Sequence, residues 1–238
     1  VNPLPVVSAG TDMAICIGST LQLGASGATS YAWNPVTDLD DANIANPIFD
    51  GAATTTFTVA GTDANGCVNT DEVTIIVNEL LIVDAGLDTA ICIGESTQLL
   101  ASGGVSYSWS PTTGLDDPLV ENPTFSGTAT TLFTVTVTDP NGCTNTDDVI
   151  VTINPLPIVD AGQDIAICTG DAVQLEANGA TTYVWSPFTD LDDVNISNPT
   201  FSGTSTTTLT VVGTDVDGCV NTDDVTVTVN PLPIIDAS

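Results

Sequence analysis

The sequence predicts an all-β fold made of three small β-sandwich modules in tandem, followed by the start of a fourth. The first observation is a 76-residue repeat, since Trp33, Trp109 and Trp185 recur at that spacing without insertion or deletion. The second is the alternation of apolar with polar residues in segments rich in Thr, Val and Ile, which is typical of half-buried strands. The third is a turn signal that returns near the end of every repeat. The predicted modules are residues 1–76, 77–152 and 153–228, and residues 229–238 form the first strand of the fourth.

The strands can be followed in order along one repeat. Leu21 and Leu23 share one face of an early strand, and Tyr31 and Trp33 alternate in the next. Later strands show the same period of two, for example at Phe133, Val135 and Val137 and at Val149, Val151 and Ile153. The intervening Thr residues have high β propensity and suit the solvent face. We therefore expect antiparallel strands packed into a sandwich.

Turn signals and proline-containing segments divide these strands. Hairpin turns are predicted between the last two strands of each repeat, at Asn65-Gly66, Asn141-Gly142 and Asp217-Gly218. The predicted linkers have the sequence NPLP or NELL, and proline favours short, extended joints. A cluster of Tyr31, Trp33 and Phe49 is the predicted core of the first module.

The charge of the chain excludes several classes of partner. It contains 30 Asp and Glu residues and no Lys, Arg or His. Nothing can neutralise phosphates, so nucleic acids and anionic lipid surfaces are excluded. No run of about 18 apolar residues is present to insert into a membrane. Cations, above all calcium, or cationic surfaces are the partners that this charge suits.

The six cysteines predict one disulfide within each module. They fall two per repeat, 51 residues apart, so each repeat can close its own bridge between the first strand and the start of the last strand. The alternative is a metal site, but no CxxC and no His is available for zinc, and no base is available to activate a catalytic cysteine. Disulfides favour an extracellular protein. The predicted bridges are Cys16–Cys67, Cys92–Cys143 and Cys168–Cys219.

Acidic residues recur at three positions of the repeat and are open to two interpretations. They are solvated loop charges, or they are calcium ligands, because calcium takes carboxylate and amide oxygens and no cationic side chain offsets these charges. No EF-hand loop is present, and no set of a nucleophile and a base predicts a catalytic residue. The candidate calcium ligands are Asp12, Asp38, Asp40, Asp41, Asp63, Asn65, Asp71, Asp88, Asp116, Asp117, Asp139, Asn141, Asp147, Asp164, Asp190, Asp192, Asp193, Asp215, Asp217 and Asp223.

The repeat resembles a known group of bacterial modules. The residues that carry the resemblance are AGxDxxIC (9–16), YxWxP (31–35), NPxF (46–49) and TDxxGC (62–67), with their copies. Together they resemble the PKD-like and immunoglobulin-like tandem repeats of large surface proteins of Bacteroidetes-type bacteria, including gliding-motility-associated adhesins. The resemblance implies an extracellular spacer, stalk or adhesive fibre without catalytic residues.

These observations predict an extracellular, cell-surface structural or adhesive protein rather than an enzyme. Its modules are expected to join head to tail, either in a longer covalent array or by strand exchange between copies, because residues 229–238 restart the repeat. Surface glycans are candidate ligands. The alternative function is a carbohydrate-binding or spacer region of a larger secreted enzyme, which rows of exposed aromatic side chains would favour.

Overall fold

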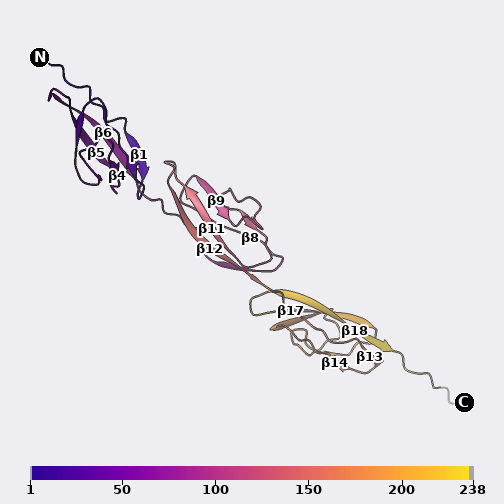
Figure 1. The fold of residues 1–238 in the computed structure, drawn as a ribbon. Helices are drawn as coiled ribbons and strands as arrows, with labels where there is room; N and C mark the ends of the chain where they lie inside the picture. Colours follow the sequence, from indigo (N-terminus) through magenta and orange to yellow (C-terminus); the bar gives the residue numbers. More distant parts are fainter. Residues whose placement is uncertain (1, 236–238) are drawn as a thin grey trace. The chain divides into compact units, whose positions relative to one another are not determined.

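Six β-strands form each repeat, and no helix is present in residues 2–235, the part of the chain that the computed structural model describes (Figure 1). Equivalent strands begin 76 residues apart, which confirms the predicted period. The first repeat contains β1 (Met13–Cys16), β2 (Leu21–Gln22), β3 (Ser30–Asn34), β4 (Ile48–Phe49), β5 (Thr55–Thr62) and β6 (Val68–Asn78). The second contains β7 (Thr89–Cys92), β8 (Thr97–Gln98), β9 (Ser106–Ser110), β10 (Thr124–Phe125), β11 (Thr131–Thr138) and β12 (Thr144–Asn154). The third contains β13 (Ile165–Cys168), β14 (Val173–Gln174), β15 (Thr182–Ser186), β16 (Thr200–Phe201), β17 (Thr207–Thr214) and β18 (Val220–Asn230).

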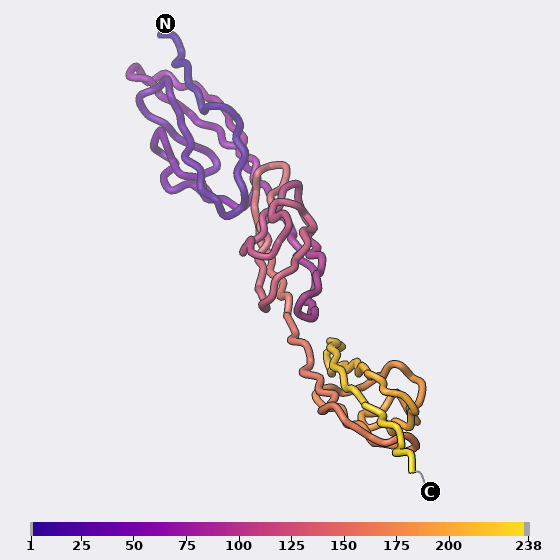
Figure 2. The backbone as a smooth tube through the Cα atoms, turned by 90° about the vertical axis from the view of Figure 1, so that its right-hand side faces the viewer, coloured from indigo at the N-terminus to yellow at the C-terminus, as the bar shows by residue number. Residues whose placement is uncertain are grey.

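Every repeat is a sandwich of a four-stranded and a two-stranded sheet. The larger sheet of the first repeat has the strand order β1-β6-β5-β3, and the smaller sheet pairs β2 with β4. The other two repeats have the same two sheets, built from β7-β12-β11-β9 with β10-β8 and from β13-β18-β17-β15 with β14-β16. Figure 2 follows the backbone through them in sequence order, from indigo to yellow. The predicted fold class, a tandem array of immunoglobulin-like β-sandwiches, is confirmed.

The core of each sandwich lies between the two sheets. In the first repeat Trp33, Phe49 and Phe57 are almost completely buried, and the ring centroids of Phe57 lie 6.5 Å from Trp33 and 5.4 Å from Phe49 in edge-to-face geometry. Phe57 belongs to this cluster but was not among its predicted members. Tyr31 is half buried, and its hydroxyl donates to the carbonyl of Ala28.

The direction of the first strand differs from the expectation. β1 pairs with β6 in parallel, with Met13 beside Ile75 and Cys16 beside Asn78. β7 pairs with β12, and β13 with β18, in the same parallel way. The other strand pairs whose register is known are antiparallel, as expected; β5 with β6 and β17 with β18 are two of them. The first strand of a repeat therefore ends where its last strand ends.

This arrangement gives a repeat two opposite ends, as the first repeat illustrates. The side chain of Asn69, at the start of β6, donates to the carbonyl of Pro5, so the chain enters the repeat there, at what we call the leading end. It leaves after Asn78, at what we call the trailing end. β6 has 11 residues, and at a rise of about 3.3 Å per residue the two ends lie roughly 33 Å apart.

The described chain divides into two compact units, and the division falls inside the second repeat. One unit comprises residues 2–86, 98–123 and 133–149, and the other comprises residues 87–97, 124–132 and 150–235. The first therefore contains the first repeat with the leading end of the second. The other contains the third repeat with the residues around β7 and the trailing end of β12.

Candidate functional site: cysteines at the ends of the repeats

The two disulfides of the structure connect successive repeats. Cys16 is bonded to Cys143, and Cys92 is bonded to Cys219, and the partners are 127 positions apart in the sequence in each case. The Cα atoms of the partners are 5.6 Å and 5.5 Å apart, within the ordinary range for a disulfide. The predicted bridges within modules, Cys16–Cys67, Cys92–Cys143 and Cys168–Cys219, are therefore wrong. Cys67 and Cys168 are unpaired.

The parallel direction of the first strand explains the correction. Cys16 is the last residue of β1 and lies beside Asn78 at the trailing end. Cys67 immediately precedes β6 and lies at the leading end. A bridge between them would have to cross the roughly 33 Å length of an 11-residue strand, whereas the Cα atoms of a disulfide lie about 4.4–6.8 Å apart. Had β1 run antiparallel to β6, Cys16 would have ended near Cys67.

Each bridge lies next to the peptide linker of the same joint. In the first unit, Cys16 pairs with Asn78 where the linker begins, and the carbonyl of Leu81 accepts a hydrogen bond of 2.9 Å from the side chain of Asn145, two residues after Cys143. In the second unit, Cys92 pairs with Asn154, and the carbonyl of Pro157 accepts from Asn221, two residues after Cys219. The joint is thus closed by two covalent connections, one peptide and one disulfide.

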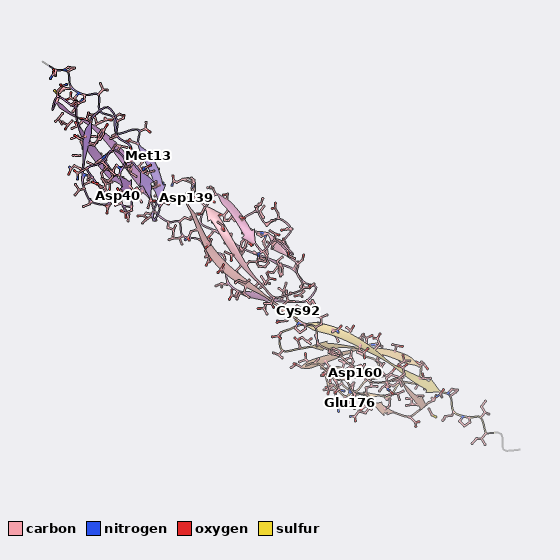
Figure 3. All side chains as sticks on the ribbon, in the orientation of Figure 1. Met13, Asp40, Cys92, Asp139, Asp160 and Glu176 are labelled. Carbon is pink, nitrogen blue, oxygen red and sulfur yellow. A yellow bond between two sulfur atoms is a disulfide. The ribbon has the colours of Figure 1, made fainter. Side chains whose placement is uncertain are left out.

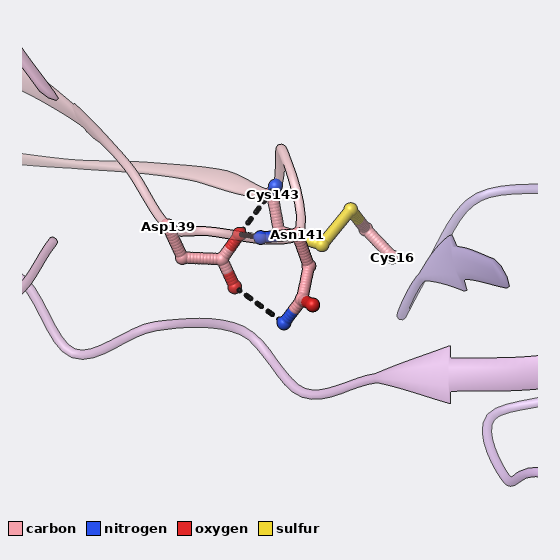
Figure 4. Close-up of a disulfide and its surroundings, with 4 residues drawn as sticks. All are labelled: Cys16, Asp139, Asn141 and Cys143. Atoms are coloured by element: carbon pink, nitrogen blue, oxygen red, sulfur yellow. Dashed lines mark hydrogen bonds between the residues drawn. A yellow bond between two sulfur atoms is a disulfide. The ribbon is translucent and has the colours of Figure 1, made fainter. Parts of the chain in front are cut away.

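A turn centred on an aspartate presents the leading-end cysteine. One carboxylate oxygen of Asp139 accepts from the backbone N–H of Asn141 and of Cys143, both at 2.8 Å, and its other oxygen accepts from the Asn141 side chain (Figure 4). Asp63 and Asp215 hold the turns of the other repeats in the same way. The N–H of Cys67, followed by that of Asn65, lowers the pKa of Asp63 because these donors stabilise the carboxylate. The TDxxGC motif is therefore a cysteine-presenting turn.

Two other recurring aspartates fasten the first segment of a repeat to its last strand. In the first repeat, Asp71 on β6 accepts from the backbone N–H of Ala9, and Asp12 accepts from the N–H of Thr74, both at 2.8 Å. The equivalent contacts recur in the other repeats, made by Asp147, Asp88, Asp223 and Asp164. These carboxylates connect the segment that begins each repeat to the last strand of that repeat.

The remaining acidic candidates organise the loop beside the buried tryptophan. Asp40 accepts from the N–H of Asp41 and, at 2.7 Å, from the N–H of Ile48 (Asp40 and Asp139 are labelled in Figure 3). Asp192 has the same role, and the N–H of Thr200 lowers its pKa. The next aspartate of the loop caps the N–H two residues later, at Asp41, Asp117 and Asp193, and Asp116 accepts from the N–H of Asp117. Asp38 and Asp190 have positive φ, where the second repeat has Gly114.

No three of the aspartates come together in the described chain as a group able to hold a metal ion. The amides Asn65 and Asn141 and the residue Asp217 belong to the turns described above. Calcium binding therefore stays a prediction. Backbone hydrogen bonding is the role that the structure gives the candidate carboxylates other than Asp38, Asp190 and Asp217. The sequence did contain a signal for this role, because Asp and Asn are also the residues that form Asx turns.

No catalytic arrangement is apparent at the surface hollow of the third repeat. This pocket of about 310 Å³ is lined by residues 174–178 with Ser197 and Asn198, and Glu176, labelled in Figure 3, is its one carboxylate. A hydrolytic site of the two-carboxylate type needs a second acid. Within residues 2–235 there is also no helix with the length and hydropathy required to cross a bilayer.

Comparisons with known proteins do not assign a family. No protein-family model matches the chain, and no curated protein matches it in sequence. Extracellular domains 3–5 of Drosophila OTK have 9% identity and a TM-score of 0.40 over 95% of this chain and 97% of theirs. The N-terminal eight Ig domains of Down Syndrome Cell Adhesion Molecule have 13% identity and a TM-score of 0.45, over 96% of this chain and 37% of theirs. The I9–I11 tandem of titin has 11% identity and a TM-score of 0.37 over 95% of this chain and 100% of its own. With TM-scores of this size, the likenesses carry no argument about this chain.

Proposed function

We propose that the chain is a segment of an extracellular structural array, a cell-surface fibre or adhesin stalk, whose joints are locked by disulfides. The observation that carries the proposal is that both bridges join successive repeats and that neither closes a single repeat. A disulfide inside a module stabilises that module alone. A disulfide beside a linker restricts the bending of one module against the next, which is what a stiff fibre requires.

The positions of the joints support the same proposal. The chain enters a repeat at its leading end and leaves it at its trailing end. Each further repeat is therefore added at the trailing end of the one before it. The turn aspartates and the linker-binding asparagines Asn69, Asn145 and Asn221 recur in all three repeats, so every joint has the same parts. The bridges also favour an oxidising, extracellular compartment.

The acidic composition suits an array rather than a binding module. Every charged side chain is negative, so neighbouring copies repel one another sideways and remain soluble. Successive repeats are connected end to end by disulfides, which need no opposite charge. Calcium remains a candidate stabiliser of the array.

The alternative, a carbohydrate-binding region, lacks its main support. Trp33, Trp109 and Trp185 are at most 2% exposed and belong to the cores. Among the Phe and Trp residues of the described chain, Phe188 alone is exposed. A single ring does not form the row of aromatic side chains that stacks against sugars, so the structural function is the better supported one.

The proposal is tested by the motion of the repeats before and after reduction. Backbone ¹⁵N relaxation of the chain, below the melting temperature of its reduced form, gives a rotational correlation time for each repeat. We expect the three repeats to tumble together when oxidised and to tumble faster and independently when reduced, while amide shifts of the sheets stay unchanged. A mutant with Cys16 and Cys143 replaced by Ser should release the first joint only.

Two results would contradict the proposal. Equal correlation times in the oxidised and reduced chain would mean that the bridges do not stiffen the joints. Saturable binding of one member of a glycan panel, lost on Phe188→Ala, would favour the carbohydrate-binding alternative.

A further inference from the structure

Cys67 and Cys168 are unpaired, yet each lies in the same local structure as a bridged cysteine. The N–H of Cys67 donates to Asp63 at 2.9 Å, as the N–H of Cys143 does to Asp139 at 2.8 Å. The carbonyl of Cys168 accepts from the N–H of Asp171 at 3.0 Å. The bridged Cys92 makes the same turn with the N–H of Glu95, also at 3.0 Å. Cys67 is therefore a leading-end cysteine, and Cys168 is a trailing-end cysteine.

The exposure of the two thiols differs from that of their bridged equivalents. Cys143 and Cys219 are 1% and 0% exposed, whereas Cys67, at the same position of the first repeat, is half buried. Cys16 and Cys92 are half buried, whereas Cys168 is exposed. Each bridged cysteine is thus less exposed than its unpaired equivalent.

The residues that follow the third repeat also carry an exposed apolar side chain. Residues 231–235 repeat the sequence with which a repeat begins. Ile235 is 87% exposed, whereas its equivalents Val7 and Val159 are 8% and 9% exposed and Val83 is half buried. An apolar side chain of this kind is ready to be buried by a following sandwich.

We propose that Cys67 and Cys168 are the two halves of a further joint of the same design. Cys168 forms a disulfide with the turn cysteine of a following repeat, and Cys67 forms one with the strand-end cysteine of a preceding repeat. The partner is a second copy of this repeat, in another molecule of the chain or in a longer polypeptide. The inference rests on the proposed function, because it assumes that the repeats are joined end to end.

The chemistry is thiol–disulfide exchange with a small or protein disulfide as the oxidant. One thiolate attacks the oxidant and releases one of its thiols, and the second thiolate then attacks the mixed disulfide and releases the other. Two cysteine thiols lose two protons and two electrons in forming the S–S bond, and the oxidant is reduced to two thiols. Exposed Cys168 is the accessible partner for the first step.

Cysteine mapping of the native, unreduced protein tests the proposal. Trypsin has no site to cleave in a chain without Lys and Arg, so digestion uses endoproteinases Glu-C and Asp-N with free thiols blocked beforehand. We expect the Cys168 peptide to be linked to a peptide that carries the TDxxGC turn. Three results would overturn the proposal. Cys67 and Cys168 could carry the blocking group, two Cys168 peptides could be joined to each other, or Cys67 and Cys168 could be joined within one chain.

A pair of variants distinguishes the two sources of the partner. Purified Cys67→Ser and Cys168→Ser chains are oxidised with glutathione disulfide, alone and as a mixture. If the partner is another molecule, the mixture alone gives a band at twice 24.2 kDa on non-reducing gels, and wild type gives a ladder. A longer polypeptide is the source if two results are found together. Native material remains far larger than 24.2 kDa after reduction, and mapping before reduction links Cys168 to a turn from outside this sequence.

Failure of this inference is separable from failure of the proposed function. The relaxation experiment measures the joints closed by Cys16–Cys143 and Cys92–Cys219, which do not involve Cys67 or Cys168. Free Cys67 and Cys168 in native material would overturn the further joint and leave those two joints unaffected.

Discussion

Loss of the bridge between Cys16 and Cys143 is predicted to destabilise the chain strongly, and loss of the two unpaired thiols is not. The disulfide closes a loop of 127 residues, for which the chain-entropy relation gives about 5 kcal/mol. If the first repeat unfolds while the second stays folded, the constrained loop runs from Cys16 to the joint, roughly 66 residues, and the same relation gives about 4 kcal/mol. The disulfide therefore contributes a similar free energy of unfolding whether the whole chain unfolds or the first repeat unfolds alone.

The assay compares two double variants of matched chemistry. The first, Cys16→Ser with Cys143→Ser, removes a bridge, and the second, Cys67→Ser with Cys168→Ser, replaces the same two kinds of position without removing one. For domains of this size about 1 kcal/mol shifts Tm by roughly 4–8 °C, so the first variant should melt about 15–30 °C below wild type. Tryptophan fluorescence reports each repeat, since each core holds one indole.

The comparison discriminates between bridging patterns. Bridges within modules would be broken by both double variants, which would then be destabilised alike. Of the two bridges in the structure, the first variant breaks Cys16–Cys143, and the second variant breaks neither. Equal melting temperatures for the two variants would refute the reasoning from strand direction.

Three further predictions concern the acidic residues. Every pair of charged side chains repels, so NaCl should raise Tm by screening; the calcium prediction requires CaCl₂ to raise it further at equal ionic strength, and equal shifts would contradict calcium binding. The pKa of Asp63 is lower in the folded than in the unfolded state, so its stabilisation is complete above about pH 4 and is lost as the pH falls through the folded pKa. Asp63→Asn should accordingly lose less stability than wild type between pH 5 and pH 3 in denaturant titrations, and identical profiles would exclude this role. Asp38 has a φ of 62° where Gly114 stands in the second repeat, so Asp38→Gly should leave stability unchanged or raise it by up to about 1 kcal/mol. A lower Tm for Asp38→Gly, seen only with calcium present, would identify Asp38 as a ligand.

Most of the fold could be predicted because it follows from local patterns. The 76-residue period located the repeats, and alternation at Tyr31 and Trp33 located a strand whose inward face holds Trp33. The turn at Asn65-Gly66 lies between β5 and β6 as predicted. Phe57 was missed because one aromatic residue in a Thr-rich strand gives little signal of which neighbours it contacts.

The recurring aspartates show how one pattern supports two interpretations. Asp12 and Asp71 recur at fixed positions, and a calcium site or a structural contact would preserve that spacing equally well. Their hydrogen bonds to Thr74 and Ala9 join residues 62 positions apart in the sequence. No local rule connects positions so far apart, so their role was visible only once the first segment was seen to lie along β6.

The sequence by itself determined the all-β class, the three sandwiches, their period and the presence of two cysteines in each repeat. The tertiary structure alone decided which cysteines meet. The physical reason is that side chains alternate with period two in parallel and antiparallel strands alike, so the apolar pattern of 13–16 contains no information about its direction against β6. That direction places Cys16 at the trailing end and Cys67 at the leading end, and it turns a bridge expected inside a module into one between repeats.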